Sequence, residues 1–193
     1  MDRARVAVLI SGRGSNMAAL LYAAKADDCP FAICAVLSDK PQAAGLALAA
    51  AEGVPTAAID AKALKAGLWP ALEAAIAEAN PDYIALAGFM RIIPAGFVER
   101  WAGRLVNIHP SLLPKYKGLH THQSAIDAGD DVTGATVHLV TPEVDSGAIL
   151  GQVEVAILPG DDAEALDARV LIAEHQLYPR VLAEFVRRAE RKQ

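Results

Sequence analysis

Cysteine and aromatic residues are scarce in this chain of 193 residues, which holds two cysteines and 5% Phe, Trp and Tyr. Two thiols, Cys29 and Cys34, do not make a disulfide scaffold, and free buried thiols in a reducing compartment are expected. The sequence also lacks an apolar run long enough to span a membrane, and it lacks the apolar core of a signal peptide. We therefore expect a cytoplasmic protein without a membrane partner.

An excess of positive charge is also absent, since 18 Lys and Arg stand against 23 Asp and Glu, a formal net charge of −5. Faces that bind nucleic acid are generally basic, so this balance argues against a nucleic-acid partner. With 53% hydrophobic residues, the chain is long enough to bury one sizeable core. We predict a single domain over residues 1–193.

Apolar runs of strand length alternate with alanine-rich segments of helical period through the first half of the chain. This pattern is typical of βαβ units and predicts an α/β fold, a Rossmann-like and mostly parallel sheet flanked by helices. A short polar connection between the last two strands predicts an antiparallel extension in the C-terminal half. Strands are predicted at 5–10, 31–37, 56–59, 82–86, 105–108, 134–140 and 149–157, and helices at 16–26, 42–52, 69–79, 95–101, 123–128 and 163–188, the last interrupted at Pro179.

Two polar residues interrupt the apolar run that begins at Leu105. Strand alternation places Asn107 and His109 on one face, and an amide donor beside an imidazole is what a tetrahedral oxyanion and its proton need. A polar loop at 140–147 offers Asp145 as a carboxylate that would orient and charge the imidazole. Taken alone, Asn107 also fits a turn cap and His109 a hydrogen-bonded core histidine.

A glycine-containing turn, Gly12-Arg13-Gly14-Ser15-Asn16, joins the first predicted strand to the first predicted helix. Backbone N–H groups and the helix dipole can hold a phosphate there, because glycine lets the backbone approach the anion. The alternative is a dinucleotide-binding fingerprint, but Met17 occupies the place of its third glycine. The turn therefore favours a phosphate over NAD.

Together these motifs, with Leu86-Ala87-Gly88-Phe89-Met90-Arg91-Ile92, Gly118-Leu119-His120-Thr121-His122 and Asp145-Ser146-Gly147, extend over nearly the whole chain. In order and spacing they resemble the folate-dependent glycinamide ribonucleotide formyltransferases of purine biosynthesis. The resemblance implies the formyltransferase fold and transfer of a formyl group from 10-formyltetrahydrofolate to the amine of glycinamide ribonucleotide. It implies a nucleotide phosphate site in the N-terminal half, and folate binding and catalysis in the C-terminal half.

The resemblance also implies a role for individual residues, with no metal required. The implied catalytic residues are Asn107, His109 and Asp145, the implied nucleotide contacts are Gly14, Ser15, Asn16 and Glu174, and the implied folate contacts are Lys65, Met90, Arg91, Ile92, Ile93 and Asn107. Two positions depart from relatives: Lys65 replaces an arginine, which loses bidentate carboxylate binding, and Leu171 replaces a polar ribose contact. His120, His122 and His138 are expected to form hydrogen bonds rather than a zinc site.

Three alternatives remain open. A methionyl-tRNA formyltransferase has the same amide, imidazole and carboxylate but adds a C-terminal nucleic-acid-binding domain, and a formyltetrahydrofolate hydrolase adds an N-terminal regulatory domain. A non-catalytic Rossmann-like nucleotide-binding module would bind ligand without turnover. The expected partners are the two small-molecule substrates, and the chain is expected to be a monomer or a homodimer.

Overall fold

The structure is a computed structural model that describes residues 3–191. The chain divides into two compact units. Within the described residues, positions up to Ile92 together with those from Val186 onward form the first unit, and Ile93–Phe185 form the second. The expectation of a single domain stays a prediction.

Four parallel strands form the sheet of the first unit, in the order β3-β2-β1-β4. They are β1 (Ala4–Ile10), β2 (Phe31–Ser38), β3 (Thr56–Ala58) and β4 (Tyr83–Leu86). The residues from Val6 to Ile10 are all fully buried. Such a continuous apolar run, in place of strict alternation, is typical of a parallel strand covered on both faces.

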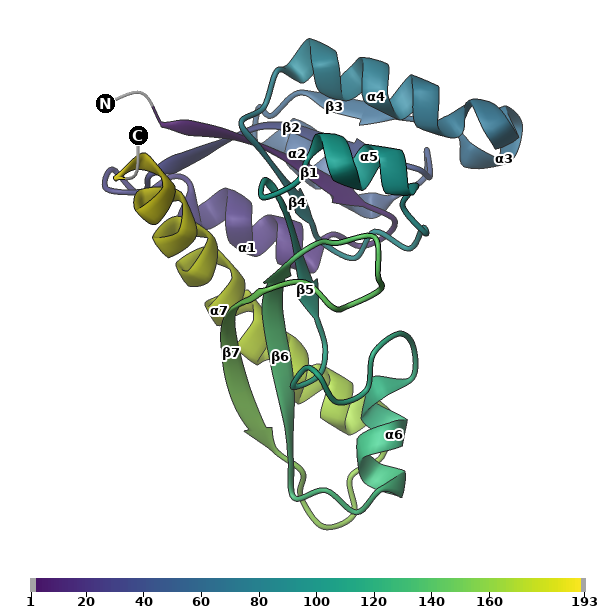
Figure 1. The fold of residues 1–193 in the computed structure, drawn as a ribbon, viewed down its shortest axis with the longest axis vertical. Coiled ribbons are helices and arrows are strands. Elements are labelled where there is room, and N and C mark those ends of the chain that lie inside the picture. Colours follow the sequence, from purple (N-terminus) through teal and green to yellow (C-terminus); the bar gives the residue numbers. More distant parts are fainter. Residues whose placement is uncertain (1–2, 192–193) are drawn as a thin grey trace. The chain divides into compact units, whose positions relative to one another are not determined.

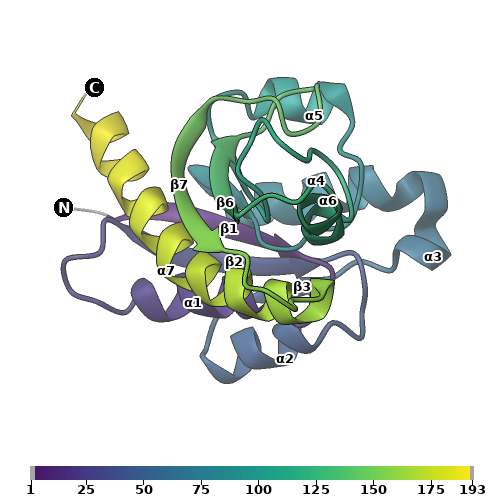
Figure 2. The ribbon, with the colours of Figure 1, turned by 90° about the horizontal axis from the view of Figure 1, so that it is seen from below.

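Helices cover both faces of this sheet. Figure 2 shows α1 (Ser15–Ala23) and α2 (Ala44–Ala51) below the strands and α4 (Leu68–Ala79) above them. Two short elements precede α4, α3 (Ala61–Leu64) and the 3-10 turn η1 (Lys65–Gly67), and the sequence patterns did not predict them. The short helix α3 begins because the Asp60 carboxylate accepts the backbone N–H groups of Lys62 and Ala63, at 2.9 and 3.1 Å.

The second unit contains three strands paired in antiparallel fashion in the order β5-β6-β7 (Figure 1). They are β5 (Leu105–His109), β6 (Val132–Leu139) and β7 (Ile149–Ala156), and the accompanying helices are α5 (Ala95–Arg100), α6 (Thr121–Asp127) and α7 (Ala163–Glu190). The predicted fold class is therefore confirmed: a parallel sheet flanked by helices is followed by an antiparallel part. Among residues 3–191, no helix combines the length and apolarity needed to cross a membrane.

The long helix α7 packs on the strands of the second unit. A Cβ at Gly151 of β7 would lie 2.5 Å from Val181 Cγ2, so helix and strand approach closely there. The fully buried Tyr178 hydroxyl donates to the carbonyl of Val106, at 3.1 Å. The predicted interruption at Pro179 is wrong, because the helix continues through it. Burial of its neighbours offsets the roughly 3 kcal/mol that an interior proline costs.

At Gly134, β6 approaches β7 so closely that there is no room for a side chain. We expect Gly134→Ala to lower the free energy of unfolding by about 3 kcal/mol, because overpacking forces the strands apart. The added Cβ would lie 1.9 Å from the carbonyl oxygen of Val153. Urea denaturation followed by circular dichroism measures the change. Gly96→Ala in α5 is the control, since its Cβ meets only Arg100 Nη1, at 3.7 Å, and an unchanged midpoint for Gly134→Ala would contradict the prediction.

An ion pair anchors the start of α7. Asp161 accepts two hydrogen bonds from Arg169, at 2.7 and 2.9 Å, and these, with the backbone N–H of Leu158, lower the pKa of Asp161 to about 2. A carboxylate with a lowered pKa stabilises the fold above its ordinary pKa, and this contribution is lost as pH falls through the folded value. We expect Asp161→Asn to lower the melting temperature at pH 7, and the gap to the wild type to close between about pH 4 and pH 2. Calorimetry over this range tests the prediction, and a gap that stays constant would contradict it.

Candidate active site

His109 ends β5 with its ring buried, 5% of the residue being exposed. Its Nε2 lies 2.9 Å from the carbonyl oxygen of Tyr116, and its Nδ1 lies 3.4 Å from Asp145 Oδ2. Both ring nitrogens thus face acceptors, so each N–H of an imidazolium has a partner. These two contacts fix the orientation of the ring at the end of β5.

Asp145 is held by the loop between β6 and β7. Its backbone adopts φ 46°, and its Oδ2 accepts the backbone N–H of Gly118 at 2.9 Å. The loop is tight: a Cβ at Gly147 would lie 1.7 Å from the Leu139 carbonyl oxygen. Lys117 Nζ also donates to Ser146 Oγ, at 2.5 Å. Two segments far apart in the sequence therefore orient the carboxylate that faces His109.

Asn107 lies opposite His138 in the antiparallel register of β5 and β6. His138 Nδ1 is 2.8 Å from the carbonyl of Leu139, which can only accept, so this nitrogen carries the hydrogen. Burial lowers the pKa of His138, and the neutral ring leaves Nε2 as an acceptor for Asn107 Nδ2 at 3.2 Å. The contact fixes which end of the Asn107 amide is the donor and leaves its second N–H for another acceptor.

His138 also approaches Asp145, with 3.6 Å between its Nε2 and the carboxylate Oδ1. A neutral His138 presents a lone pair at that nitrogen, so it offers the carboxylate no hydrogen. The ionic partner of Asp145 is therefore His109. His138 is not among the catalytic residues inferred from the sequence. Its contact with Asn107 depends on the register in which β5 and β6 pair.

Buried hydroxyl and amide groups fix the loop that follows His109. Thr136 Oγ1 donates to the Ser111 carbonyl at 2.7 Å and accepts the Leu113 N–H at 3.1 Å. Gln152 Nε2 donates to the Leu113 carbonyl, at 2.9 Å. Ser111 Oγ donates to the Lys115 carbonyl at 2.7 Å, just before the Tyr116 carbonyl that faces His109. Side chains of β6 and β7 thus hold, through hydrogen bonds, the loop whose Tyr116 carbonyl faces the imidazole.

In the first unit, the predicted phosphate turn lies between β1 and α1. Gly14 adopts φ 74° and is the N-cap residue of α1, with no side chain capping the helix. A Cβ at Gly14 would lie 3.0 Å from Gly45 Cα, so glycine allows the turn to pass close to α2. The first backbone N–H groups of a helix have no intrahelical partner, and Ser15 provides one of them at the start of α1.

Beside this turn, the ends of β1 and β2 meet in a buried polar cluster that sequence reasoning missed. Ser11 Oγ donates to Asp39 Oδ1 at 2.5 Å and accepts the backbone N–H of Met90 at 2.8 Å. Arg91 Nε donates to the other oxygen of the fully buried Asp39 carboxylate, at 2.6 Å. The cluster borders a hollow of about 600 Å³ that Gly12 also lines. The sequence does contain a signal for this cluster, because a polar residue directly follows each strand, Ser11 after β1 and Asp39 after β2.

The predicted folate residues of the first unit lie on its surface. Met90 and Ile92 expose 67% and 89% of their area to solvent, and Lys65 adopts φ 46° in η1. The Arg91 side chain is partly exposed to solvent, and its guanidinium is paired with the Asp39 carboxylate. Ile93 belongs to the second unit and is half-buried.

Glu174 and the remaining histidines lie in the second unit. Glu174 is 6% exposed, so its side chain is buried and does not face solvent. His122 Nε2 lies 3.3 Å from Asp167 Oδ1 of α7, and His120 adopts φ 57° at the start of α6. Within the described part of the chain, no three His, Cys, Asp or Glu side chains gather as a metal site would require.

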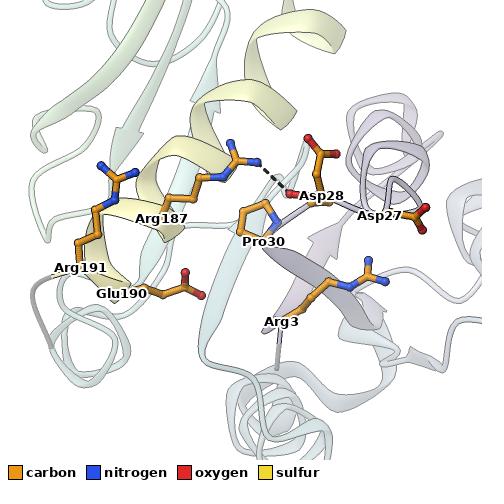
Figure 3. Close-up of a pocket in the computed structure, with 8 residues that line it drawn as sticks. Arg3, Asp27, Asp28, Pro30, Arg187, Glu190 and Arg191 are labelled. Carbon is orange, nitrogen blue, oxygen red and sulfur yellow. Dashed lines mark hydrogen bonds between the residues drawn. The ribbon is translucent and has the colours of Figure 1, made fainter. Parts of the chain in front are cut away.

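A separate hollow of about 590 Å³ lies at the other end of the first unit's sheet, where Arg3 precedes β1 and Pro30 precedes β2. In Figure 3, Arg187 donates to the backbone carbonyl of Asp28, at 2.9 Å. Acidic and basic side chains line this hollow, and none of the site residues predicted from the sequence is among them.

The strand-end grouping of an amide, an imidazole and a carboxylate is the set of groups that acyl transfer needs, here on an α/β scaffold. The family model for formyl transferases matches residues 4–182. The chain therefore belongs to the formyl transferase family.

Two of the similar proteins have the same name, and a third is a longer protein with another name. The phosphoribosylglycinamide formyltransferase of Escherichia coli K12 is 43% identical over 182 residues, which cover 93% of this chain and 86% of that protein. The crystal structure of the enzyme of the same name from Brucella melitensis superposes with a TM-score of 0.91 at 51% identity, covering 96% of both chains. The trifunctional purine biosynthetic protein adenosine-3 of Bos taurus is 44% identical over 182 residues, and the matched region is only 18% of its length.

Proposed function

We propose that this protein transfers the formyl group of 10-formyltetrahydrofolate to the amine of glycinamide ribonucleotide. The products are formylglycinamide ribonucleotide and tetrahydrofolate, in de novo purine synthesis. The observation that carries the proposal is the placement of His109 between the Tyr116 carbonyl and Asp145, with Asn107 two residues earlier on β5. Family membership and the names of the relatives support it.

The reaction replaces one carbon–nitrogen bond with another. The uncharged amine attacks the formyl carbon and the formyl oxygen becomes negative. N10 of the folate then leaves with a proton while the amine loses one, so no net proton is gained. Asn107 donates its second amide N–H to the oxyanion, and His109 stabilises it as imidazolium and supplies the proton for N10. Asp145 keeps His109 charged and oriented.

The nucleotide contacts follow from chemistry available in each unit. In the first unit, Gly14, Ser15 and Asn16 bind the phosphate with backbone N–H groups and polar side chains at the start of α1. In the second unit, the buried carboxylate of Glu174 accepts hydrogen bonds from the ribose hydroxyls. Leu171 is half-buried and provides no polar contact, so the ribose has one fewer partner than in relatives with a polar residue there.

The folate binds along 90–93, where exposed apolar side chains offer contact area for the pterin. Met90 and Ile92 provide that area, with Ile93 and the backbone of Arg91. Because Arg91 is already paired with Asp39, Lys65 is the cation that reaches the glutamate carboxylates. As a point charge on a flexible stem, it binds them without the bidentate geometry of arginine. Independence from metal, a monomeric or dimeric state and a cytoplasmic location stay predictions.

The test is formyl transfer by purified, metal-free protein with a 10-formyl folate, followed by folate absorbance with and without glycinamide ribonucleotide. Nucleotide-dependent deformylation, with the formylated product confirmed by mass, supports the proposal. Deformylation without nucleotide identifies a hydrolase. No reaction under either condition, with ligand binding retained, identifies a non-catalytic binding module.

A further inference from the structure

Asp39 directly follows β2 and has a buried carboxylate to which the proposed mechanism gives no role. The residue is 1% exposed. Its Oδ1 accepts the Ser11 hydroxyl at 2.5 Å, and its Oδ2 accepts Arg91 Nε at 2.6 Å. Taking a charged pair out of water is costly, and apolar residues of similar volume often stabilise a fold as well. Stability alone therefore does not account for a carboxylate at this place.

The hydrogen bonds of Asp39 converge on the segment that follows β4. Ser11 Oγ donates its hydrogen to Asp39 and accepts the backbone N–H of Met90, at 2.8 Å. Asp39 thereby fixes the direction of the Ser11 hydroxyl, which leaves a lone pair for the Met90 N–H. The next residue, Arg91, is held directly through its side chain. Two consecutive residues of this segment are thus tied to one carboxylate.

The segment 89–92 depends on such contacts, because it belongs to no helix or strand. Phe89 packs edge-on against Trp69 of α4, with 6.1 Å between the ring centroids. Met90 and Ile92, in contrast, expose 67% and 89% of their area. Exposed apolar side chains do not hold a chain in place through burial, so the polar contacts with the carboxylate fix the conformation of this part of the segment.

Asp39 also supports the segment that contains Lys65. Its backbone carbonyl accepts the N–H of Ala61, the first residue of α3, at 3.2 Å. The helix α3 leads directly into η1, which begins with Lys65. Lys65 is the proposed contact of the glutamate carboxylates, and 90–92 is the proposed contact of the pterin. Both proposed folate-binding segments of the first unit are therefore hydrogen-bonded to Asp39.

We propose that Asp39 is a positioning residue for the folate: its carboxylate holds Met90 and Arg91 so that the apolar surface of Met90 and Ile92 is formed before the ligand binds. This inference rests on the proposed function and adds a residue that itself contacts no substrate. Ordering a segment costs conformational entropy, and a segment ordered in advance does not charge that cost to binding. Asp39 should therefore lower the KM for the folate and leave kcat unchanged.

Two substitutions at Asp39 grade the loss of this support. Alanine removes both acceptor oxygens, whereas asparagine keeps one oxygen and the volume of the side chain but loses the charge. We expect the KM for 10-formyltetrahydrofolate to rise about tenfold in Asp39→Ala and about threefold in Asp39→Asn. The kcat and the KM for glycinamide ribonucleotide should stay within about twofold of the wild type, a split that general destabilisation would not produce.

Glu52, which ends α2 in the same unit, provides the matched control. Its carboxylate likewise accepts a hydroxyl, that of Tyr22 at 3.2 Å, and pairs with a cation, Lys25. Glu52→Ala removes a comparable set of contacts but none of those that hold 89–92, so both KM values should remain at the wild-type level. An unchanged KM for the folate in Asp39→Ala, or an equal rise in both KM values, overturns the inference.

Hydrogen exchange at the Met90 amide, measured by NMR on the wild-type protein without ligand, depends neither on turnover nor on the folding of a variant. We expect slow exchange there although Met90 lies outside the helices and strands, and exchange at least tenfold faster in Asp39→Asn. Exchange in the wild type as fast as in an unfolded peptide would show that the segment is not formed in advance and would overturn the inference. Absence of formyl transfer by the wild type would instead reject the proposed function.

Discussion

His109→Ala should reduce kcat by about 10²- to 10⁴-fold, the range that a positioned general acid contributes. The imidazole is the one group at the end of β5 that can carry a proton to the leaving nitrogen. Its removal should leave both KM values within about threefold, because the proposed phosphate, ribose and folate contacts lie elsewhere. Stopped-flow or steady-state absorbance at saturating substrates measures the change. A kcat within tenfold of the wild type would remove His109 from the mechanism.

A paired substitution shows whether the loss belongs to an ion pair or to a single residue. Asp145→Asn keeps an oxygen that accepts the Gly118 N–H, so the loop conformation is retained while the charge is removed. It isolates the electrostatic effect on His109, which Asp145→Ala would mix with loss of loop order. If His109 and Asp145 act as one unit, the double variant is no slower than His109→Ala alone, because effects within a unit are not additive.

The elements that the sequence predicted share one property, which is that their signal is local. Leu105–His109 is an apolar run interrupted by two polar residues, and Ala163–Glu190 has apolar residues at helical spacing. Both elements were predictable because patterning within one segment decides them. Pro179 shows the limit of such a pattern, since tertiary burial of its neighbours outweighs a local helix breaker.

The site contacts that the sequence did not predict depend on long-range register or on backbone conformation. Asn107 and His138 are 31 residues apart in the sequence. They meet only because of the register in which β5 and β6 pair. The Tyr116 carbonyl faces His109 from a residue at φ 56°, and no propensity marks a tyrosine for that conformation. Asp39 and Arg91 are 52 residues apart, and their pairing follows from the strand order of the first unit.

Asn107→Ala is expected to lower kcat by about 10²- to 10³-fold, or ~2.7–4 kcal/mol in activation free energy, the usual effect of losing one oxyanion donor. The His138 contact gives this prediction a matched test. His138→Phe keeps the Asn107 amide but removes the acceptor that orients it, so the donor is present without being fixed. We expect a smaller loss for that variant, about tenfold, since only orientation is relaxed.

The order of the two effects is informative. If His138→Phe were as slow as Asn107→Ala, the role of the amide would depend entirely on its orientation by the neighbouring strand. If Asn107→Ala retained kcat within threefold, His109 alone would stabilise the oxyanion. In that case, the antiparallel pairing of β5 and β6 would serve the fold of the second unit and not the reaction.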